Sequence, residues 1–378
     1  MIYFLYETYQ PNTAHINRAL AYFRSIEKMK IPIKVVFFLP DAYKSKIQED
    51  FKYVDIKYCW DNWYINNKVL KYISYWFYVN RLLFMLKMGD KVYIYALNDI
   101  KSKFVGRKGV DVFFEQTECP DISLPGSWLH HPTMEEHINF CKRIKGLIVI
   151  SHALKEYFIK KGVQPSKIHI VNMTVDETRF EGINKEPDKE KYIAYCGTVS
   201  NNKDGVDNLI KAFAIVTKKH KGIKLYIVGK APGKKENNVN IKLINELGLH
   251  DKVVLTGMVK ASEMPQLLVN AEVLALARPD NIQAKYGFPT KLGEYLLTGN
   301  PVVVTSVGDI SMYLQDGFNA IIAKPDVPEI FAEKLLWALE HPIESKTIGA
   351  RGKEVALKKF NAFIETVKLM NVVQCKNN

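Results

Sequence analysis

Short apolar runs rich in β-branched and aromatic residues alternate with stretches of helical periodicity along almost the whole chain. This alternation predicts parallel sheets, because parallel strands need crossover helices and are buried on both faces. We therefore expect an α/β fold with doubly wound sheets. The expected strands are residues 2–6, 33–39, 54–58, 91–95, 110–114, 147–150 and 169–171, followed by 192–196, 224–228, 253–256, 273–277, 301–305 and 320–323.

The alternation is interrupted once, by a polar stretch at residues 181–191 that holds a Pro, a Gly and seven charged residues. Such a composition is typical of a linker. A chain of 378 residues is also long enough for two domains of ordinary size. We predict two domains of similar size, with the ligand at the carboxyl ends of their strands, in the crevice between them.

The composition excludes several classes of protein. Apolar residues make up 47% and charged residues 25%, which excludes wholesale disorder. The first nine residues carry no basic segment, and the most membrane-like stretch, residues 73–88, falls short of the ~20 apolar residues that span a bilayer. Five scattered cysteines without a CxxC pair favour a reducing compartment and argue against a zinc site. We therefore expect a cytoplasmic protein.

The positive charge is concentrated in one part of the chain. The formal net charge is +13, and residues 28–108 hold 16 Lys and Arg against 7 Asp and Glu, with aromatic residues interleaved. This pattern suits contact with an anionic membrane surface. Helices that pack on a sheet and leave a basic side in solvent would give the same pattern. A basic nucleic-acid-binding protein is a further alternative, although no recognised nucleic-acid module is present.

Four segments of the second half place a glycine or a helix start directly after an expected strand. In the first two, the backbone at Gly197 and Gly229 can approach a phosphate, and Lys203 adds a cation. Ordinary turns that bind nothing also need glycine. The segments are residues 196–205, 228–233, 277–301 and 305–309.

The third of these segments is the most informative. Arg278 and Lys285 lie in a loop, and a helix is expected to begin near Pro289. Lys291 then falls in the first turn, where a cation opposes the helix dipole unless an anion is bound there. Glu294 follows on nearly the same face, so one ligand can meet a cation and a carboxylate, as a diphosphate joined to a ribose would. An ordinary surface ion pair is the alternative.

The second half resembles the donor-binding half of retaining, family-4-type glycosyltransferases (glycosyl transferases group 1), and the resemblance extends along nearly the whole chain. The family signature is a Glu, seven residues and a second Glu across a Gly-Phe turn, followed by a helix that ends in Gly-x-Pro-Val-Val. Residues 286–303 are similar to it, with Glu294 as the second Glu and Tyr286 in place of the first.

The turn from Gly197 to Gly205 is similar to the family's Gly-Arg…Lys-Gly phosphate site. Lys203 stands in the Lys position, Thr198 stands where Arg is usual, and Asp204 is an extra residue. One of two expected cations is therefore missing. Arg278 or Lys285 could supply that charge.

The resemblance implies the GT-B fold, in which two Rossmann-like domains face each other across a cleft. Residues 1–182 would bind the acceptor, residues 183–359 would bind the donor, and residues 360–378 would form a helix that crosses back to the first domain. The implied activity is a hexosyltransferase-type reaction that moves a sugar from a nucleotide-diphosphate-sugar to a glycan or polyprenyl-linked glycan with retention. Bacterial surface polysaccharide synthesis, at the inner face of the cell membrane, is the implied setting.

The resemblance also implies roles for individual residues. Lys203 and Lys291 would stabilise the leaving diphosphate, so we expect no metal and no cofactor, in agreement with the lack of an Asp-x-Asp motif. Glu115 and Glu118, at the end of an expected strand, could orient an acceptor hydroxyl and take its proton, or could be exposed loop acids. The donor-binding residues would be Gly197, Thr198, Lys203, Gly229, Arg278, Lys285, Tyr286, Gly287, Phe288, Pro289, Thr290, Lys291 and Glu294, and the acceptor-binding residues Asn12, Thr13, His15, Glu115 and Glu118.

Three other functions compete with this interpretation. A nucleic-acid-binding protein accounts for the basic first half only and leaves residues 287–299 without a role, so we expect no nucleic-acid partner. A phosphorylase is disfavoured by the modest chain length. An epimerase on the same fold would form its product from the donor alone.

Overall fold

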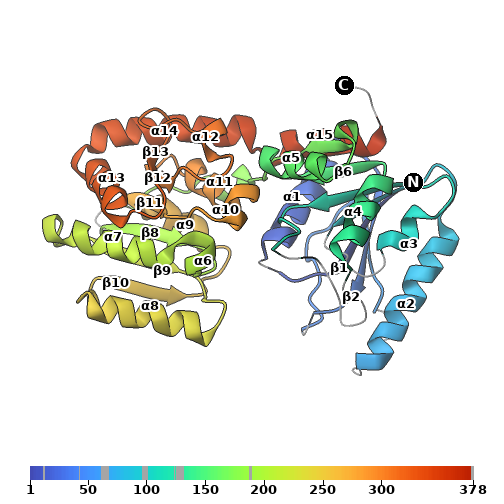
Figure 1. The fold of residues 1–378 in the computed structure, drawn as a ribbon, viewed down its shortest axis with the longest axis horizontal. Coiled ribbons are helices and arrows are strands. Elements are labelled where there is room, and N and C mark those ends of the chain that lie inside the picture. The colour runs from blue at the N-terminus through green and yellow to red at the C-terminus, as the bar shows by residue number, and fades with distance from the viewer. Residues whose placement is uncertain are drawn as a thin grey trace. The chain divides into compact units, whose positions relative to one another are not determined.

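The chain forms two compact α/β units in a computed structural model that describes residues 1–11, 13–41, 43–60, 68–95, 101–122, 124, 132–186 and 190–375. Unit 1 comprises Met1–Asn172 together with Ala362–Asn378, and unit 2 comprises Met173–Asn361 (Figure 1). Residues 173–182, expected in the first domain, thus fold with unit 2, because Met173 and Val175 pack against Gly293.

Unit 1 is built on a seven-stranded sheet in which all neighbouring strands are parallel. The strand order is β3-β2-β1-β4-β5-β6-β7, so the winding reverses between β1 and β4, as in a Rossmann-like sheet. The strands are β1 (Ile2–Thr8), β2 (Ile33–Leu39), β3 (Val54–Tyr58), β4 (Lys91–Tyr95), β5 (Asp111–Gln116), β6 (Gly146–Val149) and β7 (Ile168–Ile170). The helices are α1 (Ala14–Met29), α2 (Lys68–Met85), α3 (Lys101–Val105), α4 (Met134–Arg143), α5 (His152–Lys160) and α15 (Ala362–Gln374).

The core of unit 1 is rich in aromatic side chains. Phe4, Tyr22, Phe37 and Tyr93 are fully buried between the sheet and its helices. The last helix, α15, adds Leu369, Met370 and Val373 to this same core. The final segment of the chain is therefore part of unit 1.

Unit 2 has the same kind of architecture as unit 1, a doubly wound parallel sheet, here with six strands in the order β10-β9-β8-β11-β12-β13. Its winding reverses between β8 and β11. The strands are β8 (Tyr192–Cys196), β9 (Lys224–Val228), β10 (Val253–Gly257), β11 (Val273–Leu276), β12 (Val302–Thr305) and β13 (Ile321–Ala323). The helices are α6 (Asn201–Asp204), α7 (Val206–Lys219), α8 (Lys234–Glu246), α9 (Met264–Asn270), α10 (Ile282–Tyr286), α11 (Thr290–Leu297), α12 (Ile310–Tyr313), α13 (Pro328–Glu340) and α14 (Pro342–Lys359).

The predicted α/β class with two doubly wound parallel sheets is confirmed, and each of the expected strands is present within two residues of its expected bounds. Within the described part of the chain, no helix has both the length and the apolar composition required to cross a bilayer.

Candidate functional site

Polar residues gather in unit 2 where β8 and β11 end, next to each other at the point where the winding reverses. Ligands of doubly wound sheets bind at this point, beyond the carboxyl ends of the strands. Asp204 reaches it from the end of α6, a short helix that Ser200 caps at its start and Gly205, with φ of 65°, ends. Lys291 reaches it from the first turn of α11, which Pro289 precedes.

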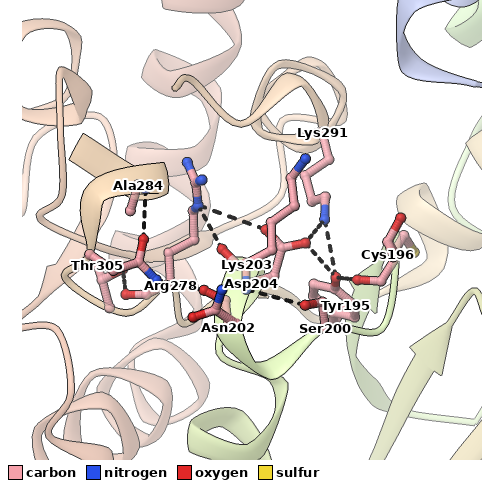
Figure 2. Close-up of polar contacts among 12 residues, drawn as sticks. Tyr195, Cys196, Ser200, Asn202, Lys203, Asp204, Arg278, Ala284, Lys291 and Thr305 are labelled. Carbon is pink, nitrogen blue, oxygen red and sulfur yellow. Dashed lines mark hydrogen bonds and ion pairs between the residues drawn. The ribbon is translucent and has the colours of Figure 1, made fainter. Parts of the chain in front are cut away.

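Asp204 is the centre of the cluster (Figure 2). Its carboxylate forms an ion pair with the Lys291 ammonium and accepts a hydrogen bond from the Tyr195 hydroxyl at 2.8 Å. The Lys291 ammonium also donates to the Tyr195 oxygen at 3.1 Å. On the other side, the Arg278 Nε lies 3.7 Å from Asp204 Oδ1 and donates to the Lys203 carbonyl at 3.2 Å. One carboxylate thus holds two cations in place.

Burial and neighbouring charges shift the pKa values of Asp204 and Lys291 in this cluster. The side chains of Asp204 and Arg278 are only 1% and 2% exposed, and that of Lys291 is 15% exposed. Burial by itself would raise the pKa of Asp204, but Lys291 and Arg278 outweigh it and hold that pKa below its usual value. Burial lowers the pKa of Lys291, and Asp204 offsets this only in part, while Arg278 and Lys203 lower it further. With two cations around one carboxylate, the cluster has an excess of positive charge.

Glycine allows the backbone to come close to these cations. A Cβ atom at Gly197 would lie 2.2 Å from the Lys291 Nζ, so a side chain at this position would displace that ammonium from where it lies. Gly229, with φ of 133°, comes so close to the Gly197 carbonyl that a Cβ would lie 1.8 Å from its oxygen. The loops after β8 and β9 therefore pack backbone to backbone beside Lys291.

Glu294 lies one turn after Lys291 on α11 and pairs with Arg179, a residue of the short helix η2 (Glu177–Phe180). Both side chains are partly exposed. A second guanidinium nitrogen of Arg179 donates to the Ala261 carbonyl at 3.4 Å. Arg179 was not among the predicted site residues.

The other predicted donor residues are distributed around this cluster. The Lys285 ammonium lies 5.5 Å from the centre of the Tyr286 ring on α10, so these two residues face each other. Phe288 is buried against Tyr313 and Phe360 and packs the loop before α11. Thr198 lies in the loop after β8, Gly287 and Pro289 lie between α10 and α11, and Thr290 is the first residue of α11.

In unit 1, Glu115 has a different setting from the one expected. It is 2% exposed on β5, pairs with the Arg18 Nε at 2.6 Å, and accepts hydrogen bonds from the Tyr22 and Tyr93 hydroxyls. Arg18 also donates to the Val171 carbonyl at 2.9 Å. A carboxylate engaged in this way is not accessible to an acceptor hydroxyl, and this placement indicates a structural role for Glu115.

The remaining acceptor-side residues lie after β1 and β5. The Thr13 hydroxyl donates to the Gln10 carbonyl at 2.7 Å, and Glu118 is partly exposed. His15, in the first turn of α1, places its ring 6.3 Å from that of Tyr95 at the end of β4, and burial lowers its pKa. Asn12 lies outside the described residues. Among the residues that the structure describes, no three His, Cys, Asp or Glu side chains group as they would around a metal ion.

One family profile matches the part of the chain that holds this cluster. The profile of the family described as glycosyl transferases group 1 matches residues 190–341. That range contains β8, β11, α11 and the whole Asp204 cluster.

Two curated relatives are similar over part of the chain. An MMP alpha-(1->4)-mannosyltransferase of Mycolicibacterium hassiacum is 26% identical over 237 residues, which is 62% of this chain and 54% of the relative. A trehalose synthase of Pyrococcus horikoshii is 29% identical over 163 residues, 41% of this chain and 37% of the relative. The chain thus spans about half or less of the length of these relatives.

Solved structures match the chain along its whole length. HepE of Anabaena in complex with UDP has a TM-score of 0.76 at 17% identity and covers 99% of both chains. Sucrose-phosphate synthase of Thermosynechococcus elongatus has a TM-score of 0.74 at 12% identity and covers 99% of this chain and 98% of its own. The two parallel-sheet, Rossmann-like domains are those of GT-B glycosyltransferase structures, so the predicted fold class is confirmed.

Proposed function

We propose that the protein is a glycosyltransferase that takes a sugar from a nucleotide-diphosphate-sugar bound in unit 2. The observation that carries this proposal is the positive cluster of Lys291, Arg278 and Lys203 at the ends of β8 and β11, inside the region that matches group 1 glycosyl transferases. Cleavage of the sugar–phosphate bond leaves negative charge on the diphosphate, and fixed cations beside glycine backbone stabilise that charge.

The finer features of the reaction are part of the same proposal. Cations of the chain itself would neutralise the leaving group, so transfer would proceed without a metal, and the anomeric configuration would be retained. Glu294, fixed by Arg179, would bind the ribose hydroxyls.

The acceptor would be a glycan or polyprenyl-linked glycan of a surface polysaccharide, reached from the cytoplasmic side of the membrane. Among the acceptor-side candidates, Thr13, His15 and Glu118 are partly exposed, which supports a place for them beside the acceptor.

A ligand screen tests the donor site directly. We expect one of UDP, GDP or ADP to raise the melting temperature of the protein, and EDTA to leave this rise unchanged. A ligand at 100 times its dissociation constant adds about 2.7 kcal/mol of stability, which is readily measured. No rise with any nucleoside diphosphate would refute the proposal. Product formed from the donor alone, without an acceptor, would indicate an epimerase instead.

Asp204→Asn is expected to lower the stability of the unliganded protein by about 3 kcal/mol, because Lys291 and Arg278 then lack their counter-charge. Since the pKa of Asp204 is lowered in the folded state, its contribution is complete above its ordinary pKa of 3.8 and is lost as the pH falls through the lowered value. A bound diphosphate would replace the lost negative charge, so the nucleoside diphosphate should stabilise the variant more than the wild type.

Thermal melting with and without the nucleoside diphosphate measures both effects. Asp251→Asn is a matched control, because Asp251 is 87% exposed in the same unit. Two results would contradict this role of Asp204. One is an Asp204→Asn variant that melts at the same temperature as the wild type, and the other is a variant that the ligand stabilises less than it stabilises the wild type.

A further inference from the structure

The helix α2 exposes an apolar face although its opposite face is already buried. Tyr75, Val79 and Leu82 are buried, as is Leu86 just after the helix, and the Tyr75 ring packs on Phe38 of β2 with centroids 5.6 Å apart. The other side carries large apolar residues at helical spacing, from Leu70 and Ile73 onwards, and Figure 1 shows α2 in light blue at an outer edge of unit 1. We name these side chains the outer face: Leu70, Ile73, Trp76, Phe77, Phe84, Met85 and, just after the helix, Met88.

The exposure of the outer face is too large to be incidental. Trp76 is 58% exposed, Phe84 82% and Met88 87%. Single exposed apolar residues are common on soluble proteins, but a contiguous patch of this kind marks a docking surface.

Positive charge surrounds the outer face. The Lys103 ammonium lies 5.6 Å from the centre of the Trp76 ring, and the Arg107 guanidinium donates to the Phe84 and Leu86 carbonyls at 3.4 and 3.3 Å. These contacts bring α3 and the residues after it against α2. The exposed cations of this surface, which we name the basic rim, are Arg81, Lys87, Lys103, Arg107 and Lys108.

Negative charge is missing from the same stretch of chain. No Asp or Glu occurs in residues 62–89, and Asp90 is engaged by the N-terminal ammonium at 2.8 Å and by the Lys87 amide. A second copy of the protein would bring its own basic rim to this surface, and the like charges would repel. An anionic bilayer supplies both an apolar interior and acidic headgroups.

We infer that the outer face of α2 and the basic rim dock on an anionic lipid bilayer. The helix lies in the plane of the interface, with Trp76, Phe77 and Phe84 at the level of the headgroups and the rim cations on the acidic lipids. The inference deepens the proposed function, because it names the surface and the lipid class that would bring unit 1 to a membrane-bound acceptor.

Flotation with vesicles tests this surface. We expect the protein to float with vesicles of phosphatidylcholine mixed with phosphatidylglycerol, much less with phosphatidylcholine alone, and less again at high salt, because salt screens the headgroup charge. Trp76→Ser combined with Phe84→Ser should abolish binding. Ile343→Ser combined with Met258→Ser, which removes apolar residues that are 80% and 66% exposed in unit 2, should leave it unchanged.

Charge reversal provides an independent pair of variants. Lys87→Glu combined with Lys103→Glu should weaken binding at least tenfold. Lys242→Glu combined with Lys260→Glu changes the net charge equally but lies on exposed sites of unit 2 and should have little effect. An unchanged circular dichroism spectrum and an unchanged melting temperature would show that each variant is folded. Absence of stabilisation of the wild type by the nucleoside diphosphate would refute the donor site without bearing on the lipid surface.

Several results would overturn the inference. These are an absence of binding to the acidic vesicles, equal losses in the control variants, and full binding by the Trp76→Ser, Phe84→Ser variant. A dimer in solution that this last variant abolishes would assign the outer face to a second copy of the chain.

Discussion

Lys291→Ala is expected to lower the rate of sugar transfer by about 10²–10³-fold, because in the proposed reaction its ammonium stabilises the charge that develops on the leaving diphosphate. Lys291 is the cation that lies directly against the Gly197 backbone, where a phosphate can approach both a positive charge and backbone N–H groups. Steady-state kinetics with the donor found in the ligand screen measures the effect, and the loss should appear in kcat.

Loss of folding must be separated from loss of catalysis in this variant. Removing Lys291 leaves Asp204 with Arg278 as its cationic partner among the described residues, so Lys291→Ala also loses stability. Lys291→Met keeps the length of the side chain and leaves the Asp204–Arg278 ion pair intact, so this variant should melt closer to the wild type while it stays inactive. Lys260→Ala, at an exposed site in the same unit, is the matched control. Near-normal transfer by the Lys291→Met variant would exclude Lys291 from the reaction.

Glu115→Ala is expected to destabilise the protein by about 3–5 kcal/mol, a large part of the stability of an ordinary domain. The substitution leaves the Arg18 guanidinium, which is 3% exposed, buried without its carboxylate, and it also removes an acceptor from the Tyr22 and Tyr93 hydroxyls. Urea denaturation followed by circular dichroism measures the change.

Two comparisons make this result specific. Glu118→Ala, three residues away and partly exposed, should change the stability by no more than about 0.5 kcal/mol. The double variant Arg18→Met, Glu115→Leu removes both buried charges and should recover most of the loss. A Glu115→Ala protein that is as stable as the wild type but inactive would contradict the structural role and would assign Glu115 to the acceptor site.

The sheets were predictable because strands buried on both faces appear in the sequence as continuous β-branched and aromatic runs. The placement of Lys291 and Glu294 on one helix was predictable for a similar reason, since both depend on local spacing. Their partners were not, because Asp204 lies 87 residues from Lys291 and Arg179 lies 115 residues from Glu294. Only the fold brings such residues together.

Glu115 shows how a small error in a boundary changes the function assigned to a residue. The expected strand ended at residue 114, which placed Glu115 in the following loop, but β5 continues to Gln116. Within a strand that is covered on both sides, a carboxylate must find a partner inside the protein, and Arg18 supplies it from α1. The sequence contains no local signal for that pairing, because Arg18 is 97 residues away.

The position of α15 in the core of unit 1 determines the order in which the chain can complete its folding during synthesis. The first 172 residues leave the ribosome without Leu369, Met370 and Val373, so their core stays open while the next 189 residues are made. Unit 2 is continuous in sequence and can close first. A nascent chain stalled before α15 would therefore contain a folded unit 2 and an incompletely folded unit 1. The aromatic core of unit 1 would then be exposed to chaperones and proteases.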